Sequence, residues 1–280
     1  MEKPSELMTG ATPAPPPDAS SVVGELRIHQ FRSKIYRNTR NLRVWLPPGY
    51  SDAGNAHRYP VLYLNDGQNL FDRATAFAGV EWQVDETADR LIREKEIPPL
   101  IIVGIDNTGP ERMKEYIPWR SFSPPIFRPL GRSYPVFLTR EVMPFVEHEY
   151  RIEKGAAHTG LGGSSLGALI SLYTAMEKPG MFGRLLVESP SLQMCNRQAL
   201  KQATKVSAWP ERVFLAMGSK ETGNDERDRQ IVLDVQEFAR ILRRVGLGDD
   251  RLRLKIAEGA THSEAAWAQR FPEALEFLFG

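Results

Sequence analysis

Residues 158–173 read HTGLGGSSLGALISLY, and this stretch decides the fold. Within it, residues 163–167 (GSSLG) fit the pattern G-x-S-x-G, in which a sharp turn joins a strand to a helix. Small residues two places before and two places after the central serine allow the strand and the helix that flank the turn to approach each other closely. The turn holds that serine in a strained conformation at the carboxyl edge of a sheet. The free N–H groups of the following helix point toward the same place.

The residues on both sides of the pattern fit this context. Residues 158–162 predict a short strand, and residues 165–176 predict a helix. A Gly-Ser turn without chemistry is the alternative, because so short a pattern arises by chance in about one chain in ten of this composition. We therefore take Ser165 as the candidate nucleophile. Ser164 is the competing hydroxyl, but its place in the pattern is an ordinary one.

Strands and helices alternate along the rest of the chain. Toward the C-terminus we predict strands at 184–188, 212–217 and 252–257, and helices at 229–245 and 264–279. Toward the N-terminus we predict strands at 26–33, 42–46, 60–64 and 100–105, and helices at 82–94 and 134–150. This alternation predicts an α/β fold with a mostly parallel central sheet, antiparallel N-terminal strands and helices on both faces.

We expect a single domain over residues 25–280, with a loop or lid insertion around 106–133. Loops of this length are usually functional. Its aromatic residues are expected to roof the site: Tyr116, Trp119, Phe122 and Phe127. Residues 1–24 contain five prolines and no aromatic residue, so we expect a disordered tail. The tail lacks the apolar stretch of a secretory signal, and we therefore expect a cytoplasmic protein.

Composition excludes several classes of protein. The 36 Lys and Arg residues against 35 Asp and Glu residues leave a net charge of +1, which argues against a nucleic-acid or membrane-surface protein. The single cysteine, Cys195, excludes a disulfide framework and a cysteine-based zinc site. No apolar run approaches the roughly 18 residues of a membrane helix.

A serine nucleophile needs a general base, and His262 is the best placed of five histidines. It stands in residues 258–264 (EGATHSE), between the last predicted strand and the last helix. In a parallel sheet this loop lies at the carboxyl edge, as Ser165 does. A surface histidine at a helix start is the structural alternative. The others lie in predicted strands (His29, His158), a polar turn (His57) and a solvated helix face (His148).

A carboxylate must orient the imidazole and stabilise its cation. In proteins with this serine pattern the chain order is serine, acid, histidine. The predicted strand 212–217 ends between Ser165 and His262 and is followed by GSKE, so we choose Glu221. Because burial of a carboxylate cannot be read from sequence, three acids remain alternatives: Asp225, Glu226 and Asp228.

Attack on a carbonyl also requires N–H donors for the developing negative charge. The N–H of Leu166, directly after the nucleophile, is one. The second is expected in the loop after the third strand, residues 65–72 (NDGQNLFD), where Gly67 allows close backbone approach and the N–H of Gln68 is the natural partner. A tight polar turn without this role is the alternative.

Four segments together resemble the “putative esterase” branch of the α/β-hydrolases, which includes enterochelin-esterase-like and esterase-D-like proteins: 44–50 (VWLPPGY), 63–72 (YLNDGQNLFD), 162–167 (GGSSLG) and 261–267 (THSEAAW). The resemblance covers the chain from about residue 25 to its end. It implies a serine esterase that needs no metal or organic cofactor, with a small-molecule ester as its partner. It places the nucleophile at Ser165, the base at His262 and the acid at Glu221.

The resemblance also suggests residues beside the substrate: Asp66, Gly67, Trp82, Arg112, Tyr116, Ser189 and Ser191. One departure concerns substrate choice. The arginines of the long loop are scattered and form no cluster suited to an anionic catecholate: Arg112, Arg120, Arg128 and Arg132. Siderophore hydrolysis is therefore left open without support.

We expect hydrolysis of a small or medium carboxylic ester through an acyl-enzyme. An acyltransferase with the same residues differs only in the acceptor of the acyl group, so the sequence leaves it open. A non-catalytic binding protein on this fold is the third alternative. The oligomeric state is left open as well.

Overall fold

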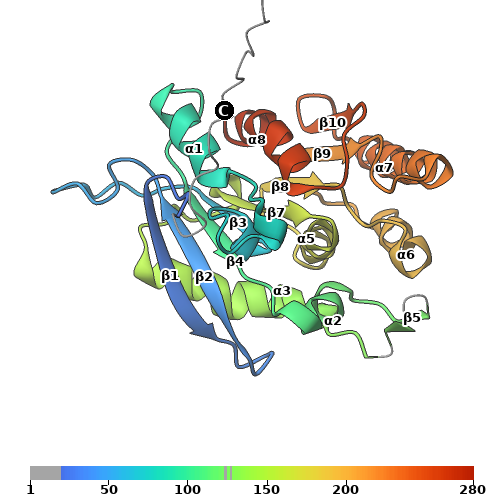
Figure 1. Ribbon diagram of the computed structural model, residues 1–280, viewed down its shortest axis with the longest axis horizontal. Helices are drawn as coiled ribbons and strands as arrows, with labels where there is room; N and C mark the ends of the chain where they lie inside the picture. The colour runs from blue at the N-terminus through green and yellow to red at the C-terminus, as the bar shows by residue number, and fades with distance from the viewer. Residues whose placement is uncertain (1–19, 123–124, 127) are drawn as a thin grey trace, which may run out of the picture.

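An eight-stranded sheet forms the centre of the computed structural model, which describes residues 20–122, 125–126 and 128–280 (Figure 1). The strand order is β1-β2-β4-β3-β7-β8-β9-β10. The strands are β1 (Glu25–Arg32), β2 (Thr39–Leu46), β3 (Val61–Asn65), β4 (Ile101–Ile105), β7 (Thr159–Ser164), β8 (Arg184–Glu188), β9 (Arg212–Gly218) and β10 (Leu252–Ala257). A separate two-stranded hairpin joins β5 (Ser121–Phe122) and β6 (Pro125–Ile126).

Pairing within the sheet changes from antiparallel to parallel along this order. β1 pairs antiparallel with β2, and β2 antiparallel with β4. From β4 onward every pair is parallel. β3, β4 and β7 are buried throughout, as expected of strands covered on both faces. The predicted mixed α/β class with an antiparallel start is therefore confirmed.

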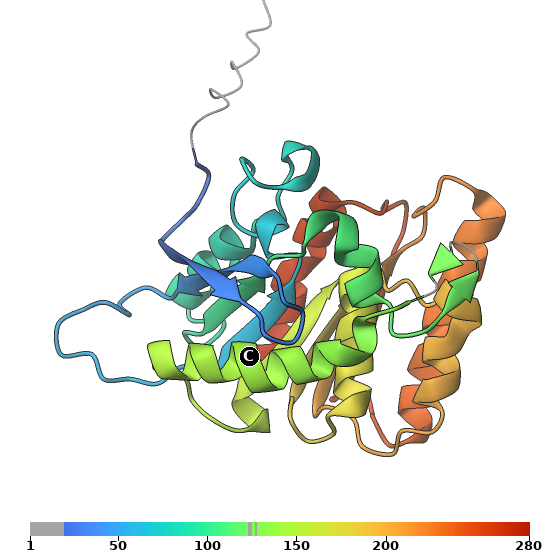
Figure 2. The ribbon, with the colours of Figure 1, turned by 90° about the horizontal axis from the view of Figure 1, so that it is seen from below.

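Helices cover both faces of the sheet (Figures 1 and 2). They are α1 (Val84–Arg93), α2 (Arg112–Tyr116), α3 (Tyr134–Phe137), α4 (Met143–Glu149), α5 (Leu166–Glu177), α6 (Met194–Ala203), α7 (Asp225–Arg244) and α8 (Glu264–Phe279). α1 and α8 pack together over one face, where their apolar residues share a core with Trp45 and Phe214. α5 and α7 pack on the opposite face, in the core that contains Tyr63.

The folded part begins earlier than predicted. Residues 1–19 of the predicted tail lie outside the described residues, but residues 20–24 contact the domain. Ser20 Oγ donates a hydrogen bond of 2.9 Å to Asp72, and Trp45 Nε1 donates one of 2.8 Å to the Val23 carbonyl. Composition favoured disorder here because it does not reveal these long-range polar contacts.

The segment 106–133 contains short elements, including α2 and the β5–β6 hairpin. Its aromatic residues were expected to roof the site. Tyr116 is instead fully buried, and Trp119 packs edge-on against Tyr173 with ring centroids 5.5 Å apart. They belong to the core because α2 packs on α5. The side chain of Phe122 and all of Phe127 lie outside the described part of the chain.

The predicted helix 134–150 is present as a continuous helical run of α3, a wider π-helical stretch at Leu138–Val142, and α4. Pro144 lies in the first turn of α4 and has no N–H to continue the regular helical ladder. The sequence analysis missed α6, in which Cys195, Asn196 and Arg197 have positive φ angles of 51–58°. In the described portion of the chain, no helix has both the length and the apolar character to cross a bilayer.

Candidate active site

Ser165 occupies the sharp turn between β7 and α5, with φ 58° and ψ −122°. This backbone conformation is strained for any residue with a side chain. The neighbouring strand loop holds it, since Ser165 N donates to the Glu188 carbonyl at 2.9 Å and Ser191 N donates to the Ser165 carbonyl at 3.3 Å. A Cβ at Gly163 would lie 2.9 Å from the Gly167 carbonyl carbon, so the turn requires glycine there. The local glycine thus permits the turn, and the loop after β8 holds its backbone in place.

Glu221 follows β9 and directs its carboxylate into the protein. The side chain is only 1% exposed. Oε1 accepts hydrogen bonds from the Gly218 N–H at 2.6 Å and the Ser189 hydroxyl at 2.7 Å, and Oε2 contacts His262 Nδ1. Burial by itself would raise the pKa of Glu221, but these hydrogen bonds and the imidazole outweigh it. The pKa therefore lies below its ordinary value of 4.5.

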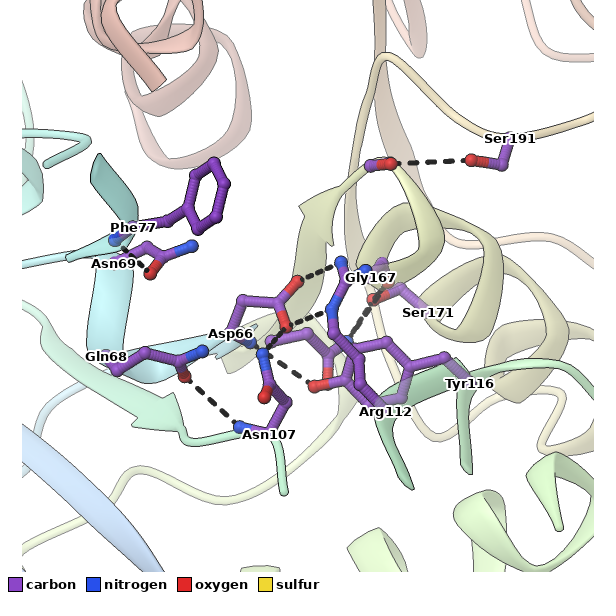
Figure 3. Close-up of polar contacts among 12 residues, drawn as sticks. Asp66, Gln68, Asn69, Phe77, Asn107, Arg112, Tyr116, Gly167, Ser171 and Ser191 are labelled. Carbon is purple, nitrogen blue, oxygen red and sulfur yellow. Dashed lines mark hydrogen bonds and ion pairs between the residues drawn. The ribbon is translucent and has the colours of Figure 1, made fainter. Parts of the chain in front are cut away.

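His262 lies in the loop between β10 and α8, with 37% of its side chain exposed. Its ring packs edge-on against Trp267 with centroids 5.0 Å apart. Among hydrogen bonds of the described residues, Nδ1 is occupied by Glu221 and Nε2 has no partner. Ser165 Oγ instead contacts Ser191 Oγ at 3.4 Å (Figure 3). Ser165 and His262 line the same two cavities, although no hydrogen bond joins them in this state.

The sequence alternatives lie elsewhere in the fold. Asp225 is exposed and pairs with Lys220 at 2.6 Å, and Asp228 accepts from the Thr222 hydroxyl at 2.8 Å. The other four histidines contact groups outside this site: Tyr150 (His29), Tyr59 (His57), Glu149 (His148) and Glu153 (His158). Of the acids considered, Glu221 is the one that contacts His262.

The two expected oxyanion donors are backbone N–H groups without an acceptor among the described residues: those of Gln68 and Leu166. Gln68 lies in a short 3-10 turn, Gly67–Asn69, which follows β3. Its side-chain Oε1 accepts from Asn107 N at 3.2 Å, as Figure 3 shows, and this contact anchors the turn to the loop after β4. Leu166 is the first residue of α5, where a free N–H is inherent to the helix.

Two cavities meet at Ser165 and His262. The smaller, of about 270 Å³, is lined by Ser165, Ser189, Pro190, Ser191, Gln193, Met217, Glu221, Thr222, Ile231 and His262. The larger, of about 550 Å³, is lined by Asp66, Gln68, Asn69, Phe77, Asn107, Gly109, Arg112, Ser164, Ser165, His262, Glu264 and Trp267. A substrate with a group on each side of its reacting carbonyl therefore has room on both sides of Ser165.

The residues expected beside the substrate divide into two groups. Asp66 and Arg112 line the larger cavity, and Ser189 and Ser191 line the smaller one. The remaining three do not line either cavity among the described residues. Gly67 packs directly on Gly104, where a Cβ would lie 2.6 Å from its carbonyl carbon. Tyr116 and Trp82 are buried, because their large rings pack against Tyr134 and Trp267 respectively.

Asn65 is a buried organiser of the site that the sequence analysis did not single out. Its Nδ2 donates to the Ser171 hydroxyl at 2.8 Å and to the carbonyls of Gly167 at 3.1 Å and Gly162 at 3.2 Å. Its Oδ1 accepts from the Tyr134 hydroxyl. The side chain thereby ties the end of β3 to the turn that carries Ser165. The sequence feature that could have indicated this role is the position of Asn65, a polar residue directly at the end of a predicted buried strand.

Among the residues that the structure describes, one acidic cluster has carboxylate oxygens close enough together to hold a metal ion. Those of Glu81, Asp85 and Glu86 lie within 4.8 Å of one another at the start of α1. Burial, with a hydrogen bond and like charge from Glu86, raises the pKa of Asp85 to about 8. Ser21 Oγ donates to Glu81 at 2.5 Å, and Val23 N donates to Asp85 at 2.6 Å. These contacts attach the N-terminal segment to α1.

Comparisons with known proteins agree with this fold. The BES protein from Bacillus cereus superposes with a TM-score of 0.72 at 21% identity, covering 98% of this chain and 100% of that one. The enterobactin esterase FES from Shigella flexneri, solved in the presence of enterobactin, gives a TM-score of 0.72 at 19% identity, over 95% of this chain and 62% of that one. The protein thus has the α/β-hydrolase fold, as the resemblance implied.

The family follows from the sequence. The model of the family described as “Putative esterase” matches residues 33–278. Among curated relatives, the uncharacterised protein YbbA of Bacillus subtilis (strain 168) is 28% identical over 248 residues, 86% of this chain and 93% of its own. The chain belongs to the putative esterase family, and it is a carboxylic ester hydrolase.

Proposed function

We propose that the protein hydrolyses small or medium carboxylic esters through Ser165, His262 and Glu221, with an acyl-enzyme intermediate. One observation carries the proposal. The buried Glu221 carboxylate contacts Nδ1 of His262, while that imidazole and Ser165 line the same two cavities. This is the arrangement in which a carboxylate orients a base beside an activated hydroxyl.

The reaction proceeds in two half-steps. Ser165 Oγ attacks the ester carbonyl carbon, and His262 Nε2 takes the hydroxyl proton. Glu221 holds Nδ1–H and stabilises the imidazolium. The N–H groups of Gln68 and Leu166 receive the oxyanion. The alcohol leaves with the proton from His262, and a water deprotonated by the same imidazole then attacks the acyl-serine, which releases the carboxylic acid and restores Ser165.

The first proton transfer requires Ser165 and His262 to come into hydrogen-bond contact. In the structure the serine hydroxyl contacts Ser191 instead. The proposal requires a side-chain rotation of Ser165 that replaces Ser191 with His262 as the partner of the hydroxyl. Hydrogen bonds of this kind often shorten only when the substrate is bound.

A fluorophosphonate probe followed by peptide mapping tests the nucleophile. We expect labelling at Ser165, loss of labelling and turnover in Ser165→Ala, and retention of both in Ser164→Ala. The second variant is a matched control, because Ser164 is the adjacent hydroxyl and also lines the larger cavity. Absence of label on the folded protein, or label on another peptide, contradicts the proposal.

Product analysis separates hydrolysis from acyl transfer. With an aryl ester in water, we expect free acid in amounts equal to the released phenol, because water is the acceptor. Added sugar or alcohol at millimolar concentration should leave this ratio unchanged. Accumulation of a transferred ester in place of the acid identifies an acyltransferase that uses the same residues.

A further inference from the structure

Two carboxylate side chains, Asp66 and Glu264, and one guanidinium side chain, Arg112, line the larger cavity. Arg112 and Asp66 form an ion pair. Arg112 donates to both carboxylate oxygens of Asp66, through Nε at 2.7 Å and Nη2 at 2.6 Å (Figure 3). The Arg112 side chain is 27% exposed and that of Asp66 is 5% exposed. In a fork-to-fork pair of this kind the positive charge is largely occupied by its partner. Arg112 is therefore a poor receptor for a substrate anion.

Glu264 is the third charged group, and its carboxylate belongs to no such pair, although Arg112 and His262 lie near enough to attract it. Its described side-chain partner is the neutral amide of Asn69, whose Nδ2 donates to it at 3.2 Å. Among ion pairs of the described residues, none involves Glu264. Burial raises its pKa above the ordinary value of 4.5, which reflects partial withdrawal from water. When ionised, the Glu264 carboxylate therefore brings a negative charge without an ion-pair partner into the cavity beside the reacting serine.

Apart from His262, the other polar groups that line this cavity are uncharged. The side-chain amides come from Gln68, Asn69 and Asn107, and the apolar surface comes from Phe77 and Trp267. The Phe77 backbone N–H donates to Asn69 Oδ1 at 3.1 Å, so one asparagine holds both Phe77 and Glu264 in place. Phe77 itself is 74% exposed at the cavity. These groups offer apolar contact and neutral hydrogen bonds to a substrate.

We propose that Glu264 is a specificity-determining residue, which makes the protein select uncharged esters over esters that carry a carboxylate in the larger cavity. Like charges in a partly desolvated cavity repel more strongly than in water, and an Arg112 already paired with Asp66 offsets only part of the repulsion. This inference rests on the proposed function, because it concerns the substrate of that same site.

The test uses two pairs of esters that differ in one charge. In the first pair the charge lies on the acyl side: 4-nitrophenyl valerate and 4-nitrophenyl hemiglutarate. In the second pair it lies on the alcohol side: acetylated methyl glucoside and the corresponding acetylated methyl glucuronide with a free carboxylate. We measure kcat/KM at pH 8 and low salt. For the pair whose charge enters the larger cavity we expect a preference for the neutral ester of about tenfold.

Glu264→Gln identifies the source of this preference. Glutamine keeps the size and the acceptor for Asn69 while it removes the charge, so the preference should fall to about two- or threefold. Glu258→Gln is the matched control. It removes an equal charge from an exposed residue outside both catalytic cavities and should leave the preference unchanged. Because each preference is a ratio measured on one enzyme, a general loss of activity cancels.

The outcomes distinguish a failure of the proposed function from a failure of the inference about Glu264. If no ester is hydrolysed by the folded protein, the proposed function fails. If the esters are hydrolysed but neither pair shows discrimination, the inference about Glu264 fails and the proposed function stands. The inference also fails if the preference survives Glu264→Gln or falls equally in Glu258→Gln.

Discussion

The Ser189 hydroxyl donates a 2.7 Å hydrogen bond to Oε1 of Glu221, although the two residues follow different strands. Trp267 Nε1 in turn donates to Ser189 Oγ at 2.9 Å. A continuous chain of contacts thus runs from α8 through Ser189 and Glu221 to His262. Because Glu221 accepts from Ser189 on one oxygen and contacts His262 with the other, its orientation is defined on both sides.

Ser189→Ala should lower kcat about tenfold and change KM little, since Glu221 loses one of its positioning donors and Trp267 Nε1 loses its acceptor. Trp267→Phe keeps an aromatic ring beside His262 but removes the N–H, and it should give a smaller loss of the same kind. Steady-state kinetics on a neutral aryl ester measure both. An unchanged kcat in a folded Ser189→Ala variant would show that Ser189 does not position Glu221 for catalysis.

The protein should lose stability in acid, in part because Glu221 becomes protonated. Its pKa is lower in the folded protein than the ordinary value of 4.5. The ionised group therefore stabilises the fold at neutral pH, and this contribution is lost as the pH falls below about 4.5 through the folded-state pKa. Glu221→Gln should have a shallower loss of stability in this range. Urea midpoints between pH 3 and 7 compare the two proteins, and equal slopes would contradict the assignment.

Gly67→Ala should destabilise the protein by about 1–3 kcal/mol and reduce activity, because the added Cβ would lie 2.6 Å from the Gly104 backbone. The displacement moves the adjacent Gln68 N–H, which we propose as an oxyanion donor. Thermal unfolding and kcat measure the two effects. Gly54→Ala is a control, since a Cβ there meets no atom within 4 Å. It should lose some stability through its φ of 80° but keep kcat.

Asn65→Asp should destabilise the protein by about 2–4 kcal/mol, although the side chains have the same shape. A carboxylate cannot donate to the carbonyls of Gly162 and Gly167, and their lone pairs would face a buried negative charge. Chemical unfolding gives the loss of stability. A wild-type midpoint in the variant would show that the Asn65 amide does not hold the Ser165 turn.

The sequence by itself determined the alternation of the main strands and helices and the turn that carries Ser165. Apolar runs such as 184–188 and the alternation at 252–257 mark strands whose bounds the structure reproduces, because burial on one or both faces imposes a short period on the residues. The G-x-S-x-G turn depends on contacts between residues four apart. Both signals are local in the chain, and a sequence shows local patterns directly.

Only the tertiary structure decided which side chains meet. The Glu221–His262 contact spans 41 residues and the Asn65–Ser171 contact spans 106. Composition indicated a tail up to residue 24, yet residues 20–24 contact the domain through groups 22–62 residues away. Tyr116 is buried and lines neither of the two cavities. These outcomes depend on how the helices pack on the sheet. That packing is the combined result of many contacts between residues far apart in the sequence.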